Sequence, residues 1–217
     1  MDNEKIERRF VNMTLRAEGD SDKPVIVGDA AVFNQETVIG SWFREVIKPG
    51  AFKRVLGEKP DVVAAMNHNW DIILGRTTAG TLRLEETDKS LRYEADINPE
   101  DSQAMSVYQK VKRGDVNQAS FAFTVRSEEW INPPDRKDLP LRNITEIDEL
   151  FDVGPCTFGA YPQASAQARS KASEFQQNAG PAEGQETDAD GEGGEGAQER
   201  AEARRRELDL LKLKIKS

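Results

Sequence analysis

The chain has 217 residues and a formal net charge of −9, with 37% hydrophobic and 32% charged residues. This acidic balance argues against a nucleic-acid-binding protein, which needs a basic face for phosphate contacts, and against an anionic membrane surface as a partner. A single cysteine excludes an internal disulfide framework, and no stretch approaches the roughly eighteen apolar residues of a membrane span. The first residues lack the apolar core of a secretory signal, so we expect a soluble, cytosolic protein.

The first half of the chain has the pattern of β-strands. A β-branched run predicts a strand at 24–33, and a short apolar run predicts another at 61–66, which leads directly into Asn67-His68. Apolar residues alternate from Leu82 to Ile97 on either side of a polar turn at 85–89. That alternation predicts a β-hairpin.

The next segments predict a helix and then more strands. The best helix candidate runs from Gln103 to Arg113 and is ended by a glycine. A strand is predicted at 118–125, because three large apolar residues alternate there with small or polar ones. A proline pair predicts a loop at 130–141, and 144–158 is typical of a last pair of extended segments, interrupted at Gly154-Pro155.

The predicted fold class is therefore α+β, mainly β: one domain over 1–167, arranged as a small barrel with a few helices. From Lys171 to about Glu199 the composition falls to Ala, Gly, Gln, Glu and Asp, which predicts an acidic disordered linker at 168–198. Residues 199–217 are rich in helix formers and predict a short amphipathic helix that docks on a partner, or frays when alone. Its apolar residues at helical spacing are Leu208, Leu211 and Ile215.

His68 is the only histidine in the chain, and it follows a predicted strand where the backbone is about to turn. Histidine is the side chain best suited to moving protons near neutral pH. A zinc site with two or more histidines is impossible, and no phosphate-binding or dinucleotide-binding glycine loop is present. The residues therefore indicate acid–base chemistry without a cofactor or a metal.

A histidine base needs a nucleophile, and two residues are candidates. Ser120 lies on the face of its predicted strand opposite the phenylalanines, between two small alanines that leave room for a substrate backbone. Cys156 is the rival, although its surroundings are typical of a buried thiol. Taken alone, His68 and Ser120 are each more typical of packing or of a polar strand face than of catalysis.

Four segments, spread over roughly Glu7 to Ala164, resemble in order the motifs of the prohead protease family of tailed phages. The fold of that family is related to the assemblin proteases of herpesviruses, which implies an assemblin-like barrel here. The segments are Phe43-Arg-Glu-Val-Ile-Lys-Pro-Gly-Ala-Phe52, Asn67-His68-Asn69 followed by Leu74-Gly75-Arg76-Thr77, Val116-Asn-Gln-Ala-Ser120-Phe-Ala-Phe123, and Leu150-Phe-Asp152-Val-Gly leading to Ala160-Tyr161-Pro162.

The resemblance implies a serine endopeptidase with Ser120 as nucleophile and His68 as base. The family usually has Glu in its closing motif and Ser-Val two residues later, whereas this chain has Asp152 and Gly154-Pro155. Assemblins use a second histidine that this chain lacks. A carboxylate must then orient the imidazole. Motif alignment selects Asp152, with Glu149 and Asp148 as reserves. Backbone amides of Gly75-Arg76 are our expectation for the oxyanion hole.

The resemblance also implies the partners. The substrates would be a scaffold protein or the scaffolding region of the major capsid protein, and the protease itself, inside the immature prohead in the host cytoplasm. The segment after about Gln167 would then be a self-removed extension, and a homodimer is expected by analogy with assemblins. The alternatives are a catalytically inactive assemblin-like scaffold or capsid assembly factor, suggested by the departures at 152 and 154, and a cysteine hydrolase that pairs Cys156 with His68.

Overall fold

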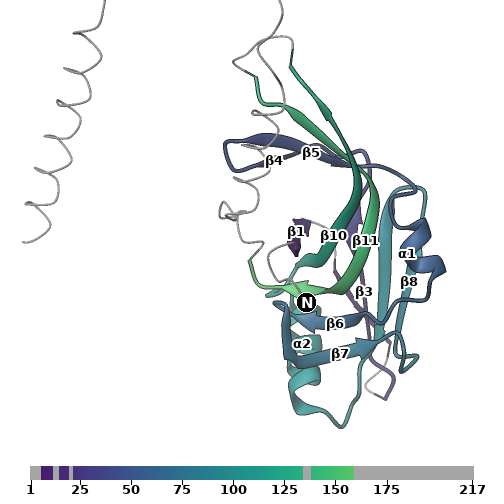
Figure 1. Ribbon diagram of the computed structural model, residues 1–217. Coiled ribbons are helices and arrows are strands. Elements are labelled where there is room, and N and C mark those ends of the chain that lie inside the picture. Colours follow the sequence, from purple (N-terminus) through teal and green to yellow (C-terminus); the bar gives the residue numbers. More distant parts are fainter. Residues whose placement is uncertain (1–5, 12–14, 20–21, 134–137, 159–217) are drawn as a thin grey trace, which may run out of the picture. The chain divides into compact units, whose positions relative to one another are not determined.

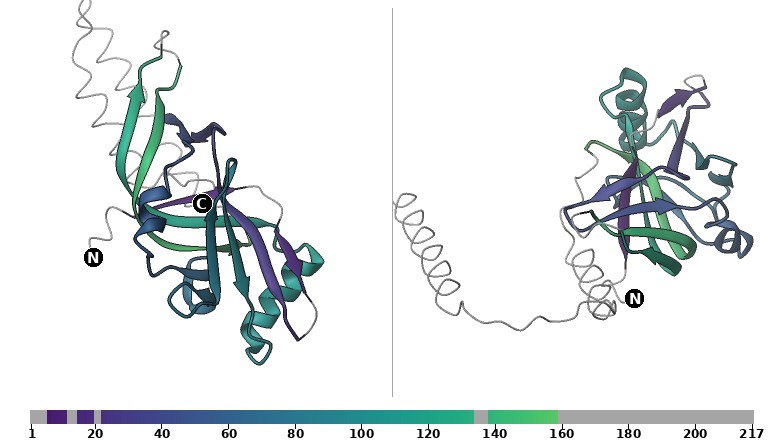
Figure 2. Two further views of the ribbon diagram at one scale, coloured as in Figure 1. Left: turned by 90° about the vertical axis from the view of Figure 1, so that its right-hand side faces the viewer. Right: turned by 90° about the horizontal axis from the view of Figure 1, so that it is seen from above.

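A computed structural model describes residues 6–11, 15–19, 22–133 and 138–158, which form two β-sheets and two α-helices (Figure 1, Figure 2). The first sheet contains β1 (Glu7–Val11), β4 (Thr37–Ile39), β5 (Phe43–Ile47), β6 (Val63–Met66), β7 (Asn69–Arg76), β10 (Gln118–Ile131) and β11 (Leu141–Cys156). The second contains β2 (Arg16–Glu18), β3 (Val25–Val32), β8 (Leu82–Glu86) and β9 (Ser90–Asp96). The helices are α1 (Lys53–Gly57) and α2 (Ser102–Arg113).

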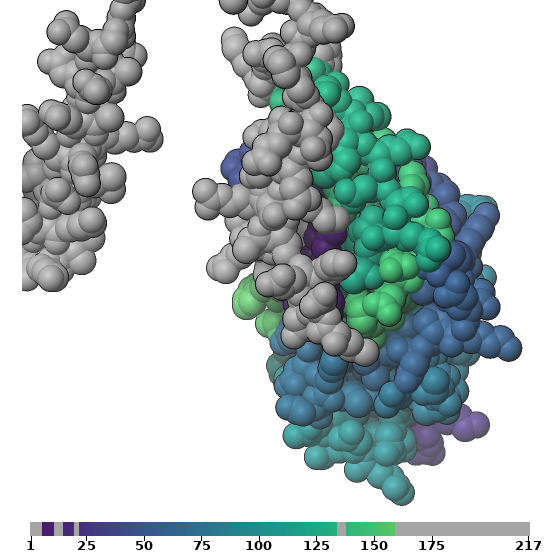
Figure 3. All heavy atoms as spheres, in the orientation of Figure 1, coloured from purple at the N-terminus to yellow at the C-terminus, as the bar shows by residue number. Residues whose placement is uncertain are grey.

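Strand β11 organises the first sheet because it pairs with three other strands. It runs antiparallel to β10, parallel to β5 near its beginning, and parallel to β6 near its end, where Asp152 lies opposite Val63. On the far side of β10, β1 pairs antiparallel and places Phe10 opposite Ser120. Figure 1 shows β6 and β7 at the lower end of β11, and Figure 3 shows the green β10–β11 hairpin forming the upper part of the described surface.

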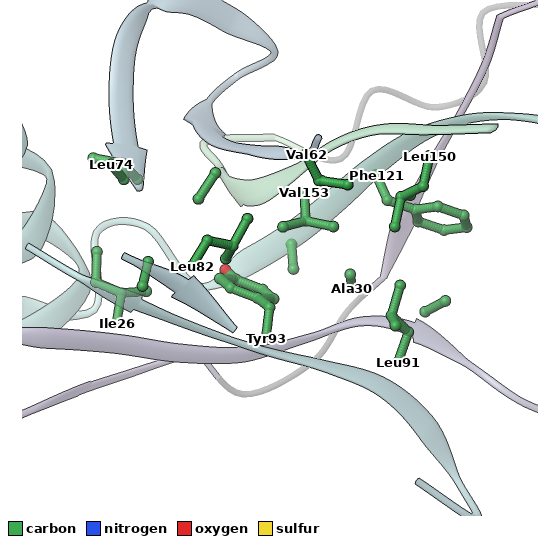
Figure 4. Close-up of a cluster of buried hydrophobic side chains, with 14 of the residues drawn as sticks. Ile26, Ala30, Val62, Leu74, Leu82, Leu91, Tyr93, Phe121, Leu150 and Val153 are labelled. Atoms are coloured by element: carbon green, nitrogen blue, oxygen red, sulfur yellow. The ribbon is translucent and has the colours of Figure 1, made fainter. Parts of the chain in front are cut away.

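The hydrophobic core lies between the two sheets. Strand β9 contributes Leu91, Tyr93 and Ala95, which are fully buried because alternate residues of a strand face the same side. Figure 4 shows side chains of both sheets meeting in this core. The labelled residues of the named strands are Ile26, Ala30, Leu82, Leu91 and Tyr93 from the second sheet and Leu74, Phe121, Leu150 and Val153 from the first.

Helix α2 confirms the helix predicted at 103–113. It begins after Asp101, whose carboxylate accepts hydrogen bonds from the Gln103 nitrogen at 2.8 Å and the Ala104 nitrogen at 3.2 Å. It ends at Gly114, which has a left-handed backbone with φ of 89° that glycine adopts without strain. Its buried face carries Ala104, Val107, Tyr108 and Val111.

The structure also confirms the strand at 24–33 as β3, a strand within 61–66 as β6, and the hairpin as β8 and β9. Two predictions about the last strands need correction. Strand β10 continues to Ile131 and β11 begins at Leu141, so both strands extend into the segment predicted as a loop. Gly154-Pro155 does not interrupt β11, since Gly154 stays paired with Ser120.

The mainly β, α+β fold class is confirmed, but within the described residues the sheets do not close into the predicted small barrel. Closure requires the edge strands of a sheet to pair with each other. Within the described residues, the first sheet ends at β1, β4 and β7, the second ends at β2 and β8, and no ladder joins them. In that part of the chain, no helix is long and apolar enough to cross a membrane. The linker predicted at 168–198 and the helix predicted at 199–217 lie outside the described residues.

Candidate active site

The turn between β6 and β7 positions His68. Asn67 and His68 are the two residues of this hairpin turn, and both have positive φ, 55° and 58°. Positive φ at both central residues characterises the type I′ turn, in which asparagine is favoured first. The turn is tied to the end of β11, because the Asn67 N–H donates to the Pro155 carbonyl at 3.0 Å and its side-chain oxygen accepts from the Thr157 nitrogen at 2.9 Å. The imidazole is thus held at a fixed end of the hairpin.

Ser120 lies on β10 opposite Gly154 of β11 and is almost completely buried, with 2% of its surface exposed. Its Oγ is 2.5 Å from His68 Nε2 and 2.9 Å from the carbonyl oxygen of Arg9 on β1. A hydroxyl has one proton, so it donates to one of these two acceptors at a time. It donates to His68 when Nε2 is bare, and it is free to donate to Arg9 when Nε2 carries a proton.

Asp152 lies on β11 and is only 1% exposed. Its Oδ1 is 2.6 Å from His68 Nδ1, and its Oδ2 accepts a hydrogen bond from the indole Nε1 of Trp70 at 2.9 Å. Each oxygen of the buried carboxylate therefore has a donor, as a charge taken out of water requires. This arrangement gives His68 a carboxylate on one ring nitrogen and a hydroxyl on the other.

The two reserve acids do not contact His68. Asp148 bonds instead to the guanidinium groups of Arg54 and Arg126, both at 3.2 Å. The Glu149 side chain is exposed on the same strand. Of the three acids that the sequence left open, Asp152 is the one brought to the imidazole.

Gly154 allows β6 to approach β11 closely enough for this geometry. Its φ of 150° is unusual for residues with a side chain, and an added Cβ would lie 2.9 Å from the Ala65 nitrogen, with the Ala65 carbonyl oxygen nearer still. Any residue larger than glycine would push the β6 backbone away from β11. The departure from the expected Ser in the closing motif is thus a packing requirement of the hairpin that carries His68.

Strand β1 is held in place by a cluster of buried charges. The Arg9 guanidinium bonds to Glu45 at 2.5 Å and to Glu7 at 2.6 Å, and Arg142 bonds to the same two glutamates. None of the four residues is more than 8% exposed. Buried charges of this kind are tolerated when each is paired with an opposite charge. The cluster therefore fixes the strand whose Arg9 carbonyl faces Ser120 and whose Phe10 ring meets the His68 ring edge-on at 5.9 Å.

The structure does not support the other two sequence hypotheses about the site. Burial raises the pKa of Cys156 to about 12, so its thiol stays protonated near neutral pH, and both ring nitrogens of His68 already bond to Ser120 and Asp152. The Gly75-Arg76 amides are also the wrong oxyanion donors. The Arg76 N–H donates to the Thr81 hydroxyl at 3.0 Å, at the end of β7 farthest from His68, about 20 Å along the strand.

Sequence reasoning missed three groups at the site: the Trp70 indole, the Arg9 carbonyl and the Phe10 ring. No motif indicates them, because each reaches the site through strand pairing or through a side-chain direction. The Asn67-His68 pair did carry a signal, since asparagine at the start of a short turn favours a hairpin with positive φ. In the part of the chain that the structure describes, no group of three His, Cys, Asp or Glu residues could hold a metal ion.

Comparison with known proteins identifies one related family. A family model described as caudovirus prohead serine protease matches residues 11–178, a segment that includes Ser120, His68 and Asp152. No curated protein and no solved structure gives a significant match to the chain.

Proposed function

Because the chain belongs to the caudovirus prohead serine protease family, we propose that Ser120, His68 and Asp152 carry its peptidase reaction. The family assignment makes the protein a serine peptidase of viral capsid maturation. The observation that supports these three residues is the continuous hydrogen-bonded chain from Ser120 Oγ through His68 to Asp152, with steps of 2.5 and 2.6 Å. Nucleophile, base and orienting acid in that order are the arrangement that serine hydrolases share.

In the proposed reaction His68 Nε2 takes the Ser120 proton while Oγ attacks the carbonyl carbon of the scissile peptide bond. The imidazolium keeps its Nδ1–H bond to Asp152, whose buried negative charge stabilises it. The C–N bond then breaks as Nε2 gives its proton to the leaving amine, which leaves an ester on Ser120. Water, deprotonated by the same nitrogen, hydrolyses the ester and restores the hydroxyl.

The shorter acid at position 152 is compatible with this mechanism. Asp152 reaches His68 because the hairpin approaches β11 at Gly154, where no side chain intervenes. The two departures from the family motif are thus consistent with each other: Gly154 lets the hairpin approach β11, and the Asp152 carboxylate then reaches the imidazole. This supports an active enzyme over a catalytically inactive scaffold.

The substrates follow from the family. Prohead proteases imply capsid and scaffold proteins as substrates in general, and the prohead as the place of action. We propose in particular that this enzyme cleaves a scaffold protein or the scaffolding region of the major capsid protein. We also propose that it removes its own segment after about Gln167, inside the prohead in the host cytoplasm. The acidic composition of 171–199, in which Phe175 is the only large apolar residue, supports self-cleavage, because segments that cannot form a core are preferred cutting sites.

The test is the intact mass of the purified wild-type chain, of Ser120→Ala and of Ser127→Ala, each incubated alone at high concentration. Ser127 is an exposed residue of the same strand and serves as the matched control. We expect wild type and Ser127→Ala to shorten, with new ends beyond Gln167, while Ser120→Ala stays whole. Equal shortening of all three would show trimming by a host protease and would reject self-cleavage.

If all three chains stay whole, co-expression with the capsid protein precursor decides between the enzyme and the inactive scaffold. Cleavage of the precursor by wild type and not by Ser120→Ala supports the proposed peptidase with a capsid substrate. An intact precursor in every combination, with capsid assembly still dependent on the chain, supports the inactive assembly factor.

A further inference from the structure

Trp70 lies beside the candidate catalytic residues and has no role in the proposed reaction. It is the second residue of β7, two positions after His68, and its side chain is half exposed. Its indole nitrogen nevertheless turns inward and donates to Asp152 Oδ2 at 2.9 Å. The indole N–H is a donor only, so the direction of this bond is unambiguous.

The carboxylate of Asp152 is held by two donors of one hairpin. His68 contacts Oδ1 and Trp70 contacts Oδ2, so both oxygens are fixed relative to β6 and β7. A carboxylate bound at one oxygen can rotate about its Cβ–Cγ bond, because that terminal torsion has a broad energy well. A second donor on the other oxygen removes this rotational freedom and stabilises the negative charge of the buried carboxylate.

We propose that Trp70 is a positioning residue, which acts through Asp152 to hold the His68 imidazole in line with Ser120. This inference rests on the proposed function, since it assumes that the three residues carry the reaction. Removing the indole N–H leaves a carboxylate oxygen without a partner at a residue that is 1% exposed. The carboxylate then rotates or binds water, and the Nδ1–H···Oδ1 bond loses its alignment.

A positioning role affects the rate of the chemical step and not the binding of the reactant. We therefore expect Trp70→Phe, which keeps an aromatic ring and deletes the N–H, to slow the reaction of Ser120 with a fluorophosphonate probe. The expected loss of the maximal inactivation rate is about ten- to a hundredfold, the range for one hydrogen bond to a charged group. The probe concentration for half-maximal rate should change by less than about twofold.

Trp130→Phe is the matched control. Trp130 also donates its indole N–H to a carboxylate, that of Glu128 at 3.0 Å, but on the part of β10 remote from Ser120. We expect this variant to be labelled at the wild-type rate. An equal loss in both variants would assign the effect to general destabilisation and would overturn the inference.

The single histidine provides a second readout that does not need activity. An Nδ1 proton donated to Asp152 should give a far-downfield proton NMR signal, which can come from no other imidazole in the chain. We expect this signal to shift or broaden in Trp70→Phe and to be unchanged in Trp130→Phe. An unchanged signal together with an unchanged labelling rate overturns the positioning role.

A double-mutant cycle keeps the inference testable if Trp70→Phe is itself less stable. Because Trp70 acts through Asp152, adding Trp70→Phe to Asp152→Ala should slow labelling no further, whereas a fully additive loss contradicts the inference. Labelling also separates this inference from the proposed function. Ser120→Ala labelled as fast as wild type rejects the proposed nucleophile, whereas Ser120-dependent labelling that is insensitive to Trp70→Phe rejects the inference alone.

Discussion

Replacing Gly154 with alanine tests whether β6 must touch β11 for the candidate site to form. The added Cβ would lie 2.9 Å from the Ala65 nitrogen and 3.1 Å from its carbonyl carbon, with the carbonyl oxygen closer still. All of these are backbone atoms, so β6 must shift to relieve the overlap. Overpacking of this kind costs about 1–3 kcal/mol. The φ of 150° adds strain for a residue with a side chain. We expect the free energy of unfolding to fall by about 2–5 kcal/mol.

Two other glycines separate the cost of steric overlap from the cost of backbone strain. Gly114→Ala meets open space but has a φ of 89°, so it carries backbone strain alone and should lose about 1–2 kcal/mol. Gly57→Ala has open space and no positive φ, so we expect no loss. Urea unfolding followed by tryptophan fluorescence measures all three, and fluorophosphonate labelling should slow only in Gly154→Ala. If Gly154→Ala loses no more stability than Gly114→Ala, the close approach of the two strands is refuted.

Three further predictions concern charge and burial. Arg142→Ala removes one arginine partner from each of two buried glutamates and should lower the free energy of unfolding by about 3–5 kcal/mol. Arg83→Ala removes an exposed ion pair and should lower it by less than about 1 kcal/mol. Equal losses in the two variants would contradict the buried cluster. Since burial raises the pKa of Cys156 to about 12, a thiol reagent near neutral pH should react only after unfolding, and rapid reaction of the folded chain would disprove this burial. Hydrogen bonding from Arg76 lowers the pKa of Asp61 to about 2, so the stability difference between wild type and Asp61→Asn should persist above about pH 4. It should vanish as the pH falls from about 4 towards 2, and a constant difference would argue against the ion pair.

The sequence identified His68 and Ser120 because each belongs to a short motif, and motif alignment selected Asp152, but no local pattern separated Asp152 from the reserve acids Glu149 and Asp148. Which acid reaches the imidazole depends on where β6 pairs along β11. The observed register places Val63 opposite Asp152, and the hairpin turn then brings His68 back to that carboxylate. Register is a tertiary property that is set by the packing of whole strands, and no local pattern encodes it.

The lengths of β10 and β11 were underestimated for a related reason. Apolar and polar residues alternate poorly in the last residues of β10 and the first residues of β11, and the two strands pair with several register shifts. Buried Ile144 and Ile147 on β11 stabilise this part of the strands together with the buried charge cluster, in which Arg142 also bonds to Glu128 on β10. From the sequence alone, charged residues are predicted to face solvent, because only the folded structure shows that their charges are paired.

Strand β11 sets both hydrogen bonds of the His68 imidazole, the one to Ser120 and the one to Asp152. On one side of β11, Gly154 pairs with Ser120; on the other, Asp152 pairs with Val63 of the hairpin that carries His68. A one-residue slip of β11 against either neighbour would turn Asp152 to the opposite face and remove it from the imidazole. The glycine, the shorter acid and the parallel pairing of β6 must therefore occur together. With this same hairpin, the longer side chain of a glutamate at 152 would carry its carboxylate past the position where it bonds to His68. We therefore expect Asp152→Glu to slow fluorophosphonate labelling, although it restores the residue usual in the family. Labelling of Asp152→Glu at the wild-type rate would show that the site tolerates the longer side chain and that the spacing is not set by β11.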